Sequence, residues 1–383
     1  MNILHVISSV FRNGGGTSEV VPRLCRAQTE LGNSVTLAVI DSGAVSDSAE
    51  EAVRSGVNLL QFPPSRYIPI VRFSSTMRRA MPRLVSDADI VHLHGLWQAP
   101  CWYAAAECRR QRKPYVMMPH GFLEPERLKI SKLKKRIVGD LVERRNLRNA
   151  AAIITTSDKE TLGVRAYGLK NPVSVMPIGL DVDRYTCTHK YRKSNGATGK
   201  KRLLYFSRIT PIKGLDMLAE AWGRLDGFHD KWELLIVGPD DRGYSRIIQS
   251  EFERLSPDGS VRFGGAVFGE EKYRLLSSAD AFVLPTRNEN WGIAAAEAMA
   301  SGLPVVCTKG APWHCIEECG CGYWVDISVD GLCYGLSKIM AATDDEQNRM
   351  GRKGREWVAV HLNWQNIASE MVSVYGNILE NNR

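Results

Sequence analysis

The chain has 383 residues, of which 44% are hydrophobic and 24% charged, as in a globular protein of two domains. Its net charge of +8 and pI near 9.0 favour an anionic partner: a nucleotide, a phospholipid surface or nucleic acid. No run of about 18 apolar residues occurs, so no membrane span is expected. The N-terminal segment lacks a basic region before its apolar run and is interpreted as a strand, not a signal peptide. An odd number of cysteines, nine, favours reduced thiols and a cytoplasmic location.

Strand-like and helix-like segments alternate along the chain, with a polar, basic break at residues 185–201 that is interpreted as a loop between domains. Before the break, strands are expected at 3–7, 35–40, 90–93, 115–118 and 151–155, and a helix at 19–31. After it, strands are expected at 202–206, 233–237, 261–264, 281–284 and 304–307, and helices at 215–225, 270–278, 293–301 and 364–379. This pattern predicts an α/β protein with two doubly wound, Rossmann-like domains, which bind ligands at the carboxyl ends of their strands.

Arg208 and Lys213 lie in the stretch FSRITPIKGLDMLAEAW, after an expected strand and before an expected helix. The amides and dipole of a helix N-terminus favour an anion there. Arginine can bind a phosphate through two parallel hydrogen bonds, and lysine supplies a compact positive charge. The loop therefore predicts a phosphate site, although two solvated surface charges would give the same pattern.

Glu289 and Glu297 lie eight residues apart in NENWGIAAAEAMASGLPVV. Eight helical residues rise about 12 Å, which resembles the separation of sugar and ribose in a nucleotide sugar. A carboxylate can accept hydrogen bonds from two neighbouring hydroxyls, and the amides of residues 290–293 are free to donate. The alanines around Glu297 predict close packing. One capping and one exposed glutamate would be the alternative interpretation.

Taken together, FSRITPIKG and VRFGGAVFGEEKYRLLSSADAFVLPTRNENWGIAAAEAMASGLPVV resemble the nucleotide-sugar domain of retaining GT-B glycosyltransferases of family four, also called group 1. The family signature is a glutamate, seven residues and a glutamate, here Glu289 and Glu297. The glycine run 14–16, the phrase MPIGLDVDRY at 176–185, Trp364 and Tyr375 also have counterparts in the family. The resemblance covers nearly the whole chain, and Pro119-His120-Gly121 is similar to a segment of bacterial polysaccharide-assembly members.

The resemblance implies a GT-B fold with an acceptor domain at 1–183, a nucleotide-sugar domain at 184–362 and a helix at 363–383 that crosses back to the first domain. With the residue patterns, it assigns catalytic roles to His120, Arg208, Lys213 and Glu289. The implied donor-binding residues are Gly15, Gly16, Arg208, Lys213, Gly238, Val267, Glu289, Asn290, Trp291, Gly292, Ile293 and Glu297. The implied acceptor-binding residues are His94 and Trp97, with His94 otherwise a hydrogen-bonded histidine at a strand end.

Two segments depart from the family pattern. Many members have Glu-Gly-Phe-Gly where this chain has Glu289-Asn290-Trp291-Gly292, so the donor sugar and its contacts do not follow from the signature. The segment APWHCIEECGCGYWV at 311–325 replaces a commoner glycine-glycine turn.

Metal and nicotinamide sites are the main alternative interpretations. His92, His94 and His120 would need a further ligand to bind zinc, and the spacing of Cys315, Cys319 and Cys321 matches no common zinc site. The glycine run with Asp41 matches a nicotinamide motif poorly, because its glycines are consecutive. We therefore expect no metal and no cofactor, only a nucleotide sugar as co-substrate.

The segment from Arg127 to Arg148 carries nine lysines and arginines around a helical apolar stripe. A basic amphipathic helix predicts docking to an anionic membrane surface at the inner face, although a solvated helix packed on the sheet explains the pattern equally well. Nucleic acid is not expected, because no aromatic platform accompanies the charge.

The resemblance implies a retaining, metal-independent hexosyltransferase that uses a nucleoside-diphosphate sugar and a glycan or lipid-linked acceptor in polysaccharide biosynthesis. UDP-glucose is the first expected donor and GDP-mannose the second. A sugar-nucleotide epimerase of the same fold and a non-enzymatic nucleotide-sugar binding protein are the alternatives, and retention of Arg208, Lys213, Glu289 and Glu297 disfavours the second of these.

Overall fold

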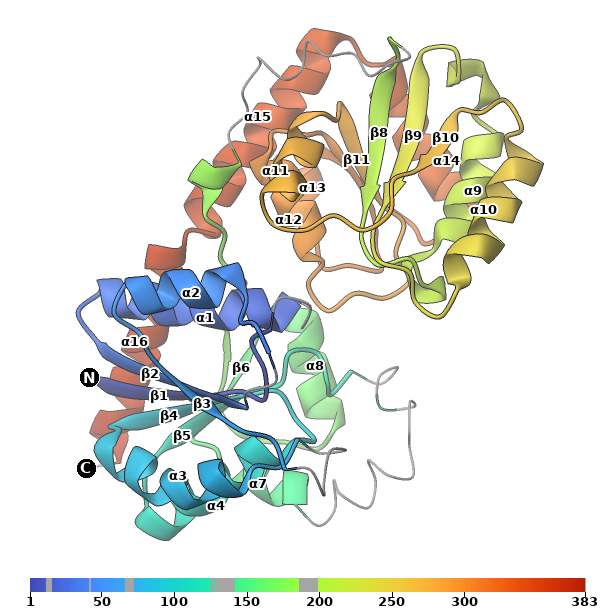
Figure 1. The fold of residues 1–383 in the computed structure, drawn as a ribbon. Helices are drawn as coiled ribbons and strands as arrows, with labels where there is room; N and C mark the ends of the chain where they lie inside the picture. Colours follow the sequence, from blue (N-terminus) through green and yellow to red (C-terminus); the bar gives the residue numbers. More distant parts are fainter. Residues whose placement is uncertain are drawn as a thin grey trace. The chain divides into compact units, whose positions relative to one another are not determined.

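The computed structural model describes residues 1–11, 16–40, 43–65, 72–124, 128, 142–185 and 199–382. The chain forms two compact units (Figure 1). Unit 1 comprises Met1–Gly179 and Trp364–Arg383, and unit 2 comprises Leu180–Asn363. The α/β class with two Rossmann-like domains, expected from the alternating pattern, is confirmed.

Unit 1 contains a seven-stranded parallel sheet in the order β3-β2-β1-β4-β5-β6-β7. Its strands are β1 (Asn2–Val6), β2 (Ser34–Ile40), β3 (Asn58–Phe62), β4 (Ile90–His94), β5 (Tyr115–Met118), β6 (Ala152–Thr155) and β7 (Val173–Val175). Its helices are α1 (Gly16–Glu30), α2 (Asp47–Arg54), α3 (Ser75–Asp87), α4 (Ala99–Gln111), α7 (Arg144–Arg148), α8 (Asp158–Ala166) and α16 (Trp364–Asn381). The strand order reverses between β1 and β4, which marks the ligand end of a doubly wound sheet.

Unit 2 repeats this plan with a six-stranded parallel sheet in the order β10-β9-β8-β11-β12-β13. Its strands are β8 (Lys201–Phe206), β9 (Trp232–Val237), β10 (Val261–Phe263), β11 (Ala281–Leu284), β12 (Val305–Thr308) and β13 (Gly322–Val325). Its helices are α9 (Leu215–Gly223), α10 (Tyr244–Leu255), α11 (Glu270–Ser277), α12 (Ile293–Ala300), α13 (Cys315–Glu318), α14 (Val329–Ala341) and α15 (Asp344–His361), with short 3₁₀ turns η2 (Val182–Arg184), η3 (Pro211–Lys213) and η4 (Asp226–Phe228). Here the order reverses between β8 and β11.

The central strands are mostly apolar, because helices cover both faces of each sheet. All residues of β5, β11 and β12 are buried, and β4 is buried from Ile90 to His94 although it contains two histidines. The strands that the sequence pattern did not reveal are β3, β7 and β13, each half-exposed over much of its length. Such edge strands lack the continuous apolar run that marks a buried one.

The unit boundaries differ by a few residues from the domain limits expected at 183 and 362. The backbone N–H of Leu180 donates to the Leu362 carbonyl at 2.7 Å, and Leu180 pairs with Asn363 in a parallel bridge. Tyr185 belongs to the unit 2 core. These contacts hold residues 180–185 on unit 2, and the chain returns to unit 1 at Trp364. There α16 packs against α1 and buries Ile367, Ala368, Met371 and Tyr375.

The basic segment 127–148 lies mostly outside the described residues. Its C-terminal end forms α7, in which Asn146 and Leu147 are buried. Within the described parts of the chain, every helix is too short or too polar to cross a membrane. The prediction of membrane docking therefore stays a prediction.

Candidate functional site

Two loops flank the reversal point of the unit 2 sheet and carry most of the predicted donor-site residues. The loop after β8 holds Arg208 and ends in the turn η3, which contains Lys213. The loop after β11 holds Glu289 and leads into α12. Backbone bonds join the two loops, since Arg287 N–H donates to the Ile212 carbonyl at 2.9 Å. Lys213 and Glu289, which are 76 positions apart in the chain, are thus held together at the carboxyl ends of neighbouring strands.

Lys213 and Glu289 form an ion pair within this site. Their side chains are 8% and 20% exposed, so both charges lie largely out of water and stabilise one another. Gly214, which follows Lys213, has a φ of 69°, and a Cβ at this position would lie 2.1 Å from the Pro285 carbonyl oxygen. Only glycine permits this close approach of the η3 turn to the loop after β11.

Arg208, by contrast, is exposed. Within the described part of the chain, its guanidinium makes no hydrogen bond or ion pair, and its carbonyl accepts a bond from the Tyr205 hydroxyl at 2.8 Å. Gly238, after β9, has a φ of 156°, and a Cβ there would lie 1.8 Å from the Ser207 carbonyl oxygen. Gly238 therefore allows the loop after β9 to approach the backbone that presents Arg208.

Glu297 lies on α12, where the neighbouring alanines pack as the sequence predicts. Ala295, Ala296, Ala298 and Ala300 are fully buried, and Glu297 is 5% exposed. Its Oε1 accepts hydrogen bonds from the Tyr185 hydroxyl at 3.0 Å and from Lys272 Nζ at 2.6 Å. Its Oε2 has no hydrogen-bond partner among the described residues and is left to accept from a ligand.

The two departures from the family pattern form one structural unit. Trp313, from the segment 311–325, is 1% exposed and packs on Trp291 with ring centroids 5.0 Å apart. Its Nε1–H donates to the Trp291 carbonyl at 2.6 Å. Gly292 follows with a φ of 80° and is the N-cap of α12. It offers no side chain to the first-turn amides, of which Ala295 N–H donates to the Gly292 carbonyl at 2.9 Å. Trp313 thus fixes the loop between Glu289 and α12.

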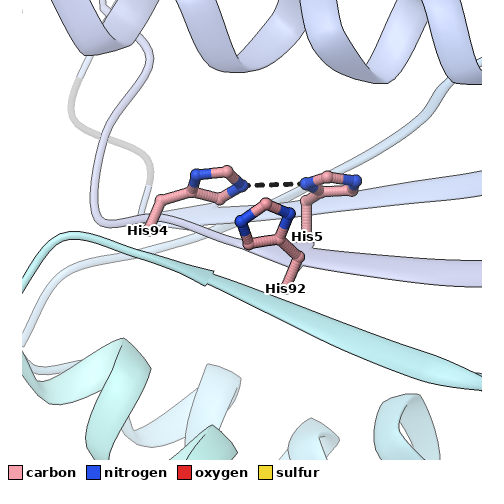
Figure 2. A group of neighbouring side chains, drawn as sticks. All are labelled: His5, His92 and His94. Carbon is pink, nitrogen blue, oxygen red and sulfur yellow. Dashed lines mark hydrogen bonds between the residues drawn. The ribbon is translucent and has the colours of Figure 1, made fainter. Parts of the chain in front are cut away.

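A cluster of buried histidines occupies the reversal point of the unit 1 sheet. His5 on β1 pairs in register with His92 on β4, and His94 lies two residues further on the same face. The three are 0–1% exposed, and one ring nitrogen of each lies within 4.8 Å of the others (Figure 2). His94 and His5 are hydrogen-bonded through their rings at 2.8 Å.

His94 is 1% exposed and hydrogen-bonded at both ring nitrogens. Its Nε2 bonds to His5, and its Nδ1 bonds to His120 Nε2 at 3.1 Å. These bonds agree with the alternative interpretation, a hydrogen-bonded histidine at a strand end, and the acceptor-binding role of His94 stays a prediction. His120 follows β5 and remains 9% exposed.

His120 has a φ of 55°, a left-handed conformation that is uncommon outside glycine. The buried carboxylate of Glu160 stabilises this turn, accepting from Gly121 N–H at 2.5 Å and from Thr156 N–H at 2.7 Å. Such over-determined backbone is typical of functional sites.

Trp97, the second predicted acceptor residue, is half-buried and also left-handed, with a φ of 66°. Its backbone N–H donates to Glu143 Oε1 at 2.6 Å, and Trp102 Nε1–H donates to the same oxygen at 2.5 Å. Burial raises the pKa of Glu143, and the two hydrogen bonds only partly oppose this shift. Glu143 therefore fixes the turn that follows β4.

The remaining predicted positions give less information. Gly15 and Asp41 lie outside the described residues, and Gly16 is the exposed first residue of α1. Val267 packs half-buried on the unit 2 core. Cys315 and Cys321 are buried and Cys319 is half-buried. Among the described residues, the grouping with metal-ligand proximity is the histidine trio, not these thiols.

Comparison with known families decides the relationship. Residues 14–184 match the Glycosyltransferase Family 4 profile, and residues 188–357 match that of Glycosyl transferases group 1. The chain belongs to the group 1 glycosyltransferases. The member GDP-mannose:cellobiosyl-diphosphopolyprenol alpha-mannosyltransferase of Xanthomonas campestris is 26% identical over 91% of this chain and 87% of its own.

Glycosyltransferase MJ1607 of Methanocaldococcus jannaschii is 30% identical over 50% of this chain and 48% of its own. The chain spans between 48% and 60% of the length of the first three curated relatives that it matches. Sucrose-phosphate synthase from Thermosynechococcus elongatus matches the whole fold, with a TM-score of 0.77 and 20% identity over 100% of both chains. Its likeness shows the GT-B fold, with two Rossmann-like domains, for this chain.

Several residues that contact the candidate site residues were not singled out from sequence. Lys272 is one lysine in an exposed helix, and nothing in EEKYR marks it as a partner of Glu297. Glu160 follows an N-cap serine and reads as an ordinary capping glutamate. Gln28 and Tyr375, which contact the histidines, lie 347 residues apart. For Gln28, the sequence offers one indication: a glutamine lies among apolar residues on the buried face of a helix.

Proposed function

We propose that the protein transfers a hexose, with retention at the anomeric carbon, from a nucleoside-diphosphate sugar to a hydroxyl of a glycan or lipid-linked acceptor in polysaccharide biosynthesis. The observation that carries this proposal is the grouping of Arg208, Lys213 and Glu289 on two loops at the reversal point of the unit 2 sheet. Glu297 extends the same site along α12. Membership of the group 1 glycosyltransferases supports the assignment.

The cationic side of the site would stabilise the departing diphosphate. Arg208 is exposed and has all its donors available within the described part of the chain. Lys213 uses one donor on Glu289, and an ammonium group has two more. With the first-turn amides of α12, these groups oppose the charge that develops on the leaving phosphate. The leaving phosphate itself would take the acceptor proton on the same face.

The two glutamates would fix the ends of the donor. Glu289 would hold sugar hydroxyls in line for reaction, because a carboxylate accepts several hydrogen bonds at once. Glu297 would accept from the ribose through Oε2, because Tyr185 and Lys272 occupy Oε1. His120 would contact a sugar hydroxyl of the substrate, as the family resemblance implies.

The donor is proposed as GDP-mannose or UDP-glucose. The sequence resemblance alone put UDP-glucose first. The relative that aligns over 91% of this chain is named for GDP-mannose, which favours the mannose donor. An epimerase is the competing activity, and it differs in needing no acceptor.

A differential thermal-shift screen of nucleotide sugars tests the proposal, because a ligand that binds the folded state raises its melting temperature. GDP-mannose or UDP-glucose should raise it in the intact protein, and an Arg208→Ala protein should lose most of the shift. Product analysis then follows, with sugar transfer expected only when an acceptor is present. Conversion of the free nucleotide sugar without acceptor would contradict the transferase assignment in favour of an epimerase.

We further propose that Arg208 and Lys213 serve in place of a divalent metal ion and that the protein acts at the cytoplasmic side of the membrane. Turnover should then survive EDTA. Loss of activity in EDTA, restored by Mn²⁺ or Mg²⁺, would contradict the first proposal. Equal binding to neutral and anionic vesicles would contradict electrostatic docking by the segment 127–148.

A further inference from the structure

A continuous chain of buried hydrogen bonds runs across unit 1 from α1 to the turn after β5. Gln28 Oε1 lies 2.7 Å from His5 Nε2, and His5 Nδ1 lies 2.8 Å from His94 Nε2. His94 Nδ1 lies 3.1 Å from His120 Nε2. Figure 2 shows the central link, in which the His94 and His5 rings face each other nitrogen to nitrogen. Gln28, His5 and His94 are 0%, 0% and 1% exposed.

The three imidazoles in this hydrogen-bond chain, those of His5, His94 and His120, are neutral. Burial lowers the pKa of His5 to about 4 and that of His120 to about 4. Burial, together with the other histidines, lowers the pKa of His94 well below its ordinary value. A neutral imidazole carries one N–H and one bare nitrogen, so each ring donates at one end and accepts at the other.

The direction in which these hydrogen bonds donate follows from Gln28. Its amide nitrogen lies 3.3 Å from the Tyr375 hydroxyl, which leaves its carbonyl oxygen facing His5. A carbonyl oxygen only accepts, so the hydrogen of His5 is on Nε2 and its Nδ1 accepts from His94 Nε2–H. His94 Nδ1 then accepts from His120 Nε2–H. The remaining nitrogen, His120 Nδ1, is a bare acceptor, and it has no hydrogen-bond partner among the described residues.

The ring geometry favours this hydrogen-bond chain over a metal site. A metal ion lies in the plane of each imidazole that binds it. The rings of His92 and His94 are stacked, with centroids 4.1 Å apart and an interplanar angle of 24°. Their lone pairs therefore lie in separate, nearly parallel planes, which do not meet at a point close to both rings. His92 instead bonds through Nδ1 to the Tyr375 hydroxyl at 2.6 Å.

We propose that Gln28, His5 and His94 are positioning residues that set the tautomer of His120, so that His120 Nδ1 accepts a hydrogen bond from a substrate hydroxyl. This role rests on the proposed sugar transfer. The Glu160 contacts hold the His120 turn in place, so the ring cannot compensate for a wrong tautomer by moving with its backbone. α16 takes part in this control, because Tyr375 orients the Gln28 amide.

The full-length protein with ¹⁵N-labelled histidine tests the assignment by NMR, because the two ring nitrogens of a neutral histidine differ in shift when one is protonated. The signal that disappears in His120→Gln identifies His120. The expected wild-type result is protonation at Nε2 and a bare Nδ1. Protonation at His120 Nδ1 in the wild type would overturn the proposal without any mutant.

Two variants of similar length at position 28 then test the link. Gln28→Met removes both polar atoms, and His120 should show a mixture of tautomers. Gln28→Lys places a donor against His5, and the His120 proton should move to Nδ1. The kcat/KM for the nucleotide sugar should fall about tenfold in Gln28→Lys and by less in Gln28→Met, as expected for one mispaired hydrogen bond. Affinity for the free nucleoside diphosphate should not change.

The other outcomes are also decisive. An unchanged His120 tautomer in both variants would overturn the link to Gln28, and the wild-type and Gln28→Met spectra still decide the question if Gln28→Lys does not fold. Stoichiometric shifts of His5, His92 and His94 on adding Zn²⁺ would overturn it in favour of a metal site. A wild-type protein with the expected tautomer but no sugar transfer would remove the proposed function and leave the hydrogen-bond chain intact.

Discussion

The two units use the same type of sheet but place opposite kinds of polar chemistry at its reversal point. In unit 2, the side chains are ion pairs, Lys213 with Glu289 and Lys272 with Glu297. In unit 1, they are neutral imidazoles stacked and hydrogen-bonded in the interior. The charged site suits an anionic diphosphate and polyhydroxyl ligand. The neutral imidazoles of unit 1 carry no net charge to bind an anion. Their hydrogen bonds instead run in one direction, because each ring fixes which nitrogen of the next ring donates and which accepts.

The largest expected difference between the units is their response to acid. Folded His5 and His120 have pKa values of about 4, because burial disfavours their charged forms, whereas an unfolded histidine has a pKa of 6.5. Below pH 6.5 the unfolded chain therefore binds more protons than the folded one, and stability falls with pH until about 4. Each such histidine contributes a slope of about 1.4 kcal/mol per pH unit in this window.

Hydrogen exchange at pH 7 and pH 5, corrected for the intrinsic rate, measures this effect. Strands β1 and β4 should lose protection at pH 5, while β8 and β11 should keep most of theirs. In unit 2, burial raises the pKa of Asp216, but the hydrogen bonds from Arg287 outweigh burial and lower it. The stability that this carboxylate contributes is therefore lost only as the pH falls through the ordinary pKa of 3.8 and below. His92→Gln should reduce the acid slope of unit 1. Equal loss of protection in both units would contradict the comparison.

Removing a cation from unit 2 is the next largest effect. Arg208→Ala or Lys213→Ala should each lower kcat by two orders of magnitude or more, as the loss of one preorganised donor costs about 3 kcal/mol. Lys213→Ala also leaves the Glu289 charge without its lysine. Steady-state kinetics with saturating acceptor measures this. Arg254→Ala, which removes an exposed ion pair with Glu251, is the matched control and should leave kcat unchanged.

Lys272→Met tests whether nucleotide binding depends on the ion pair between Lys272 and Glu297. The side chains of Lys272 and Glu297 are 18% and 6% exposed. In the variant, Tyr185 would be the remaining hydrogen-bond donor to this carboxylate among the described residues. Nucleotide affinity should fall by about 1.5–3 kcal/mol, the range for a hydrogen bond to a charged group. Calorimetry with the free nucleoside diphosphate measures the loss, and an affinity equal to that of the wild type would count against the pair.

The smallest expected effect concerns the loop that holds Glu289. Trp313→Phe removes the hydrogen bond to the Trp291 carbonyl but keeps most of the ring packing. The donor KM should rise several-fold, about 1 kcal/mol, with kcat little changed. Trp324→Phe is the control, because Trp324 Nε1–H donates to the Ala311 carbonyl in the same segment. Identical KM changes in both variants would show that the loop does not depend on Trp313.

Sequence predicted unit 2 better than unit 1, for a physical reason. The strands β8 and β11 are recognisable in the sequence as apolar runs. The charged residues that follow them therefore stand out: Arg208, Lys213, Glu289 and Glu297. The resemblance implies an acceptor contact for His94, whereas the alternation of His92 and His94 shows only that they share a face of the strand. Their partners His5, Gln28 and Tyr375 come from distant elements, and no local pattern states that these side chains meet. Lys272 was missed for the same reason.

The central claim is that Glu289 holds the donor sugar and Glu297 the ribose, and calorimetry with the free nucleoside diphosphate tests it most directly. GDP and UDP are first titrated into the wild type to choose the ligand. Glu289→Gln should bind that nucleotide nearly as well as the wild type yet lose turnover, because only the sugar contact is changed. Glu297→Gln should weaken the nucleotide by roughly 1.5–3 kcal/mol, the range for hydrogen bonds to a charged group. Lost affinity in Glu289→Gln with retained affinity in Glu297→Gln, or no change in either protein, would contradict the account.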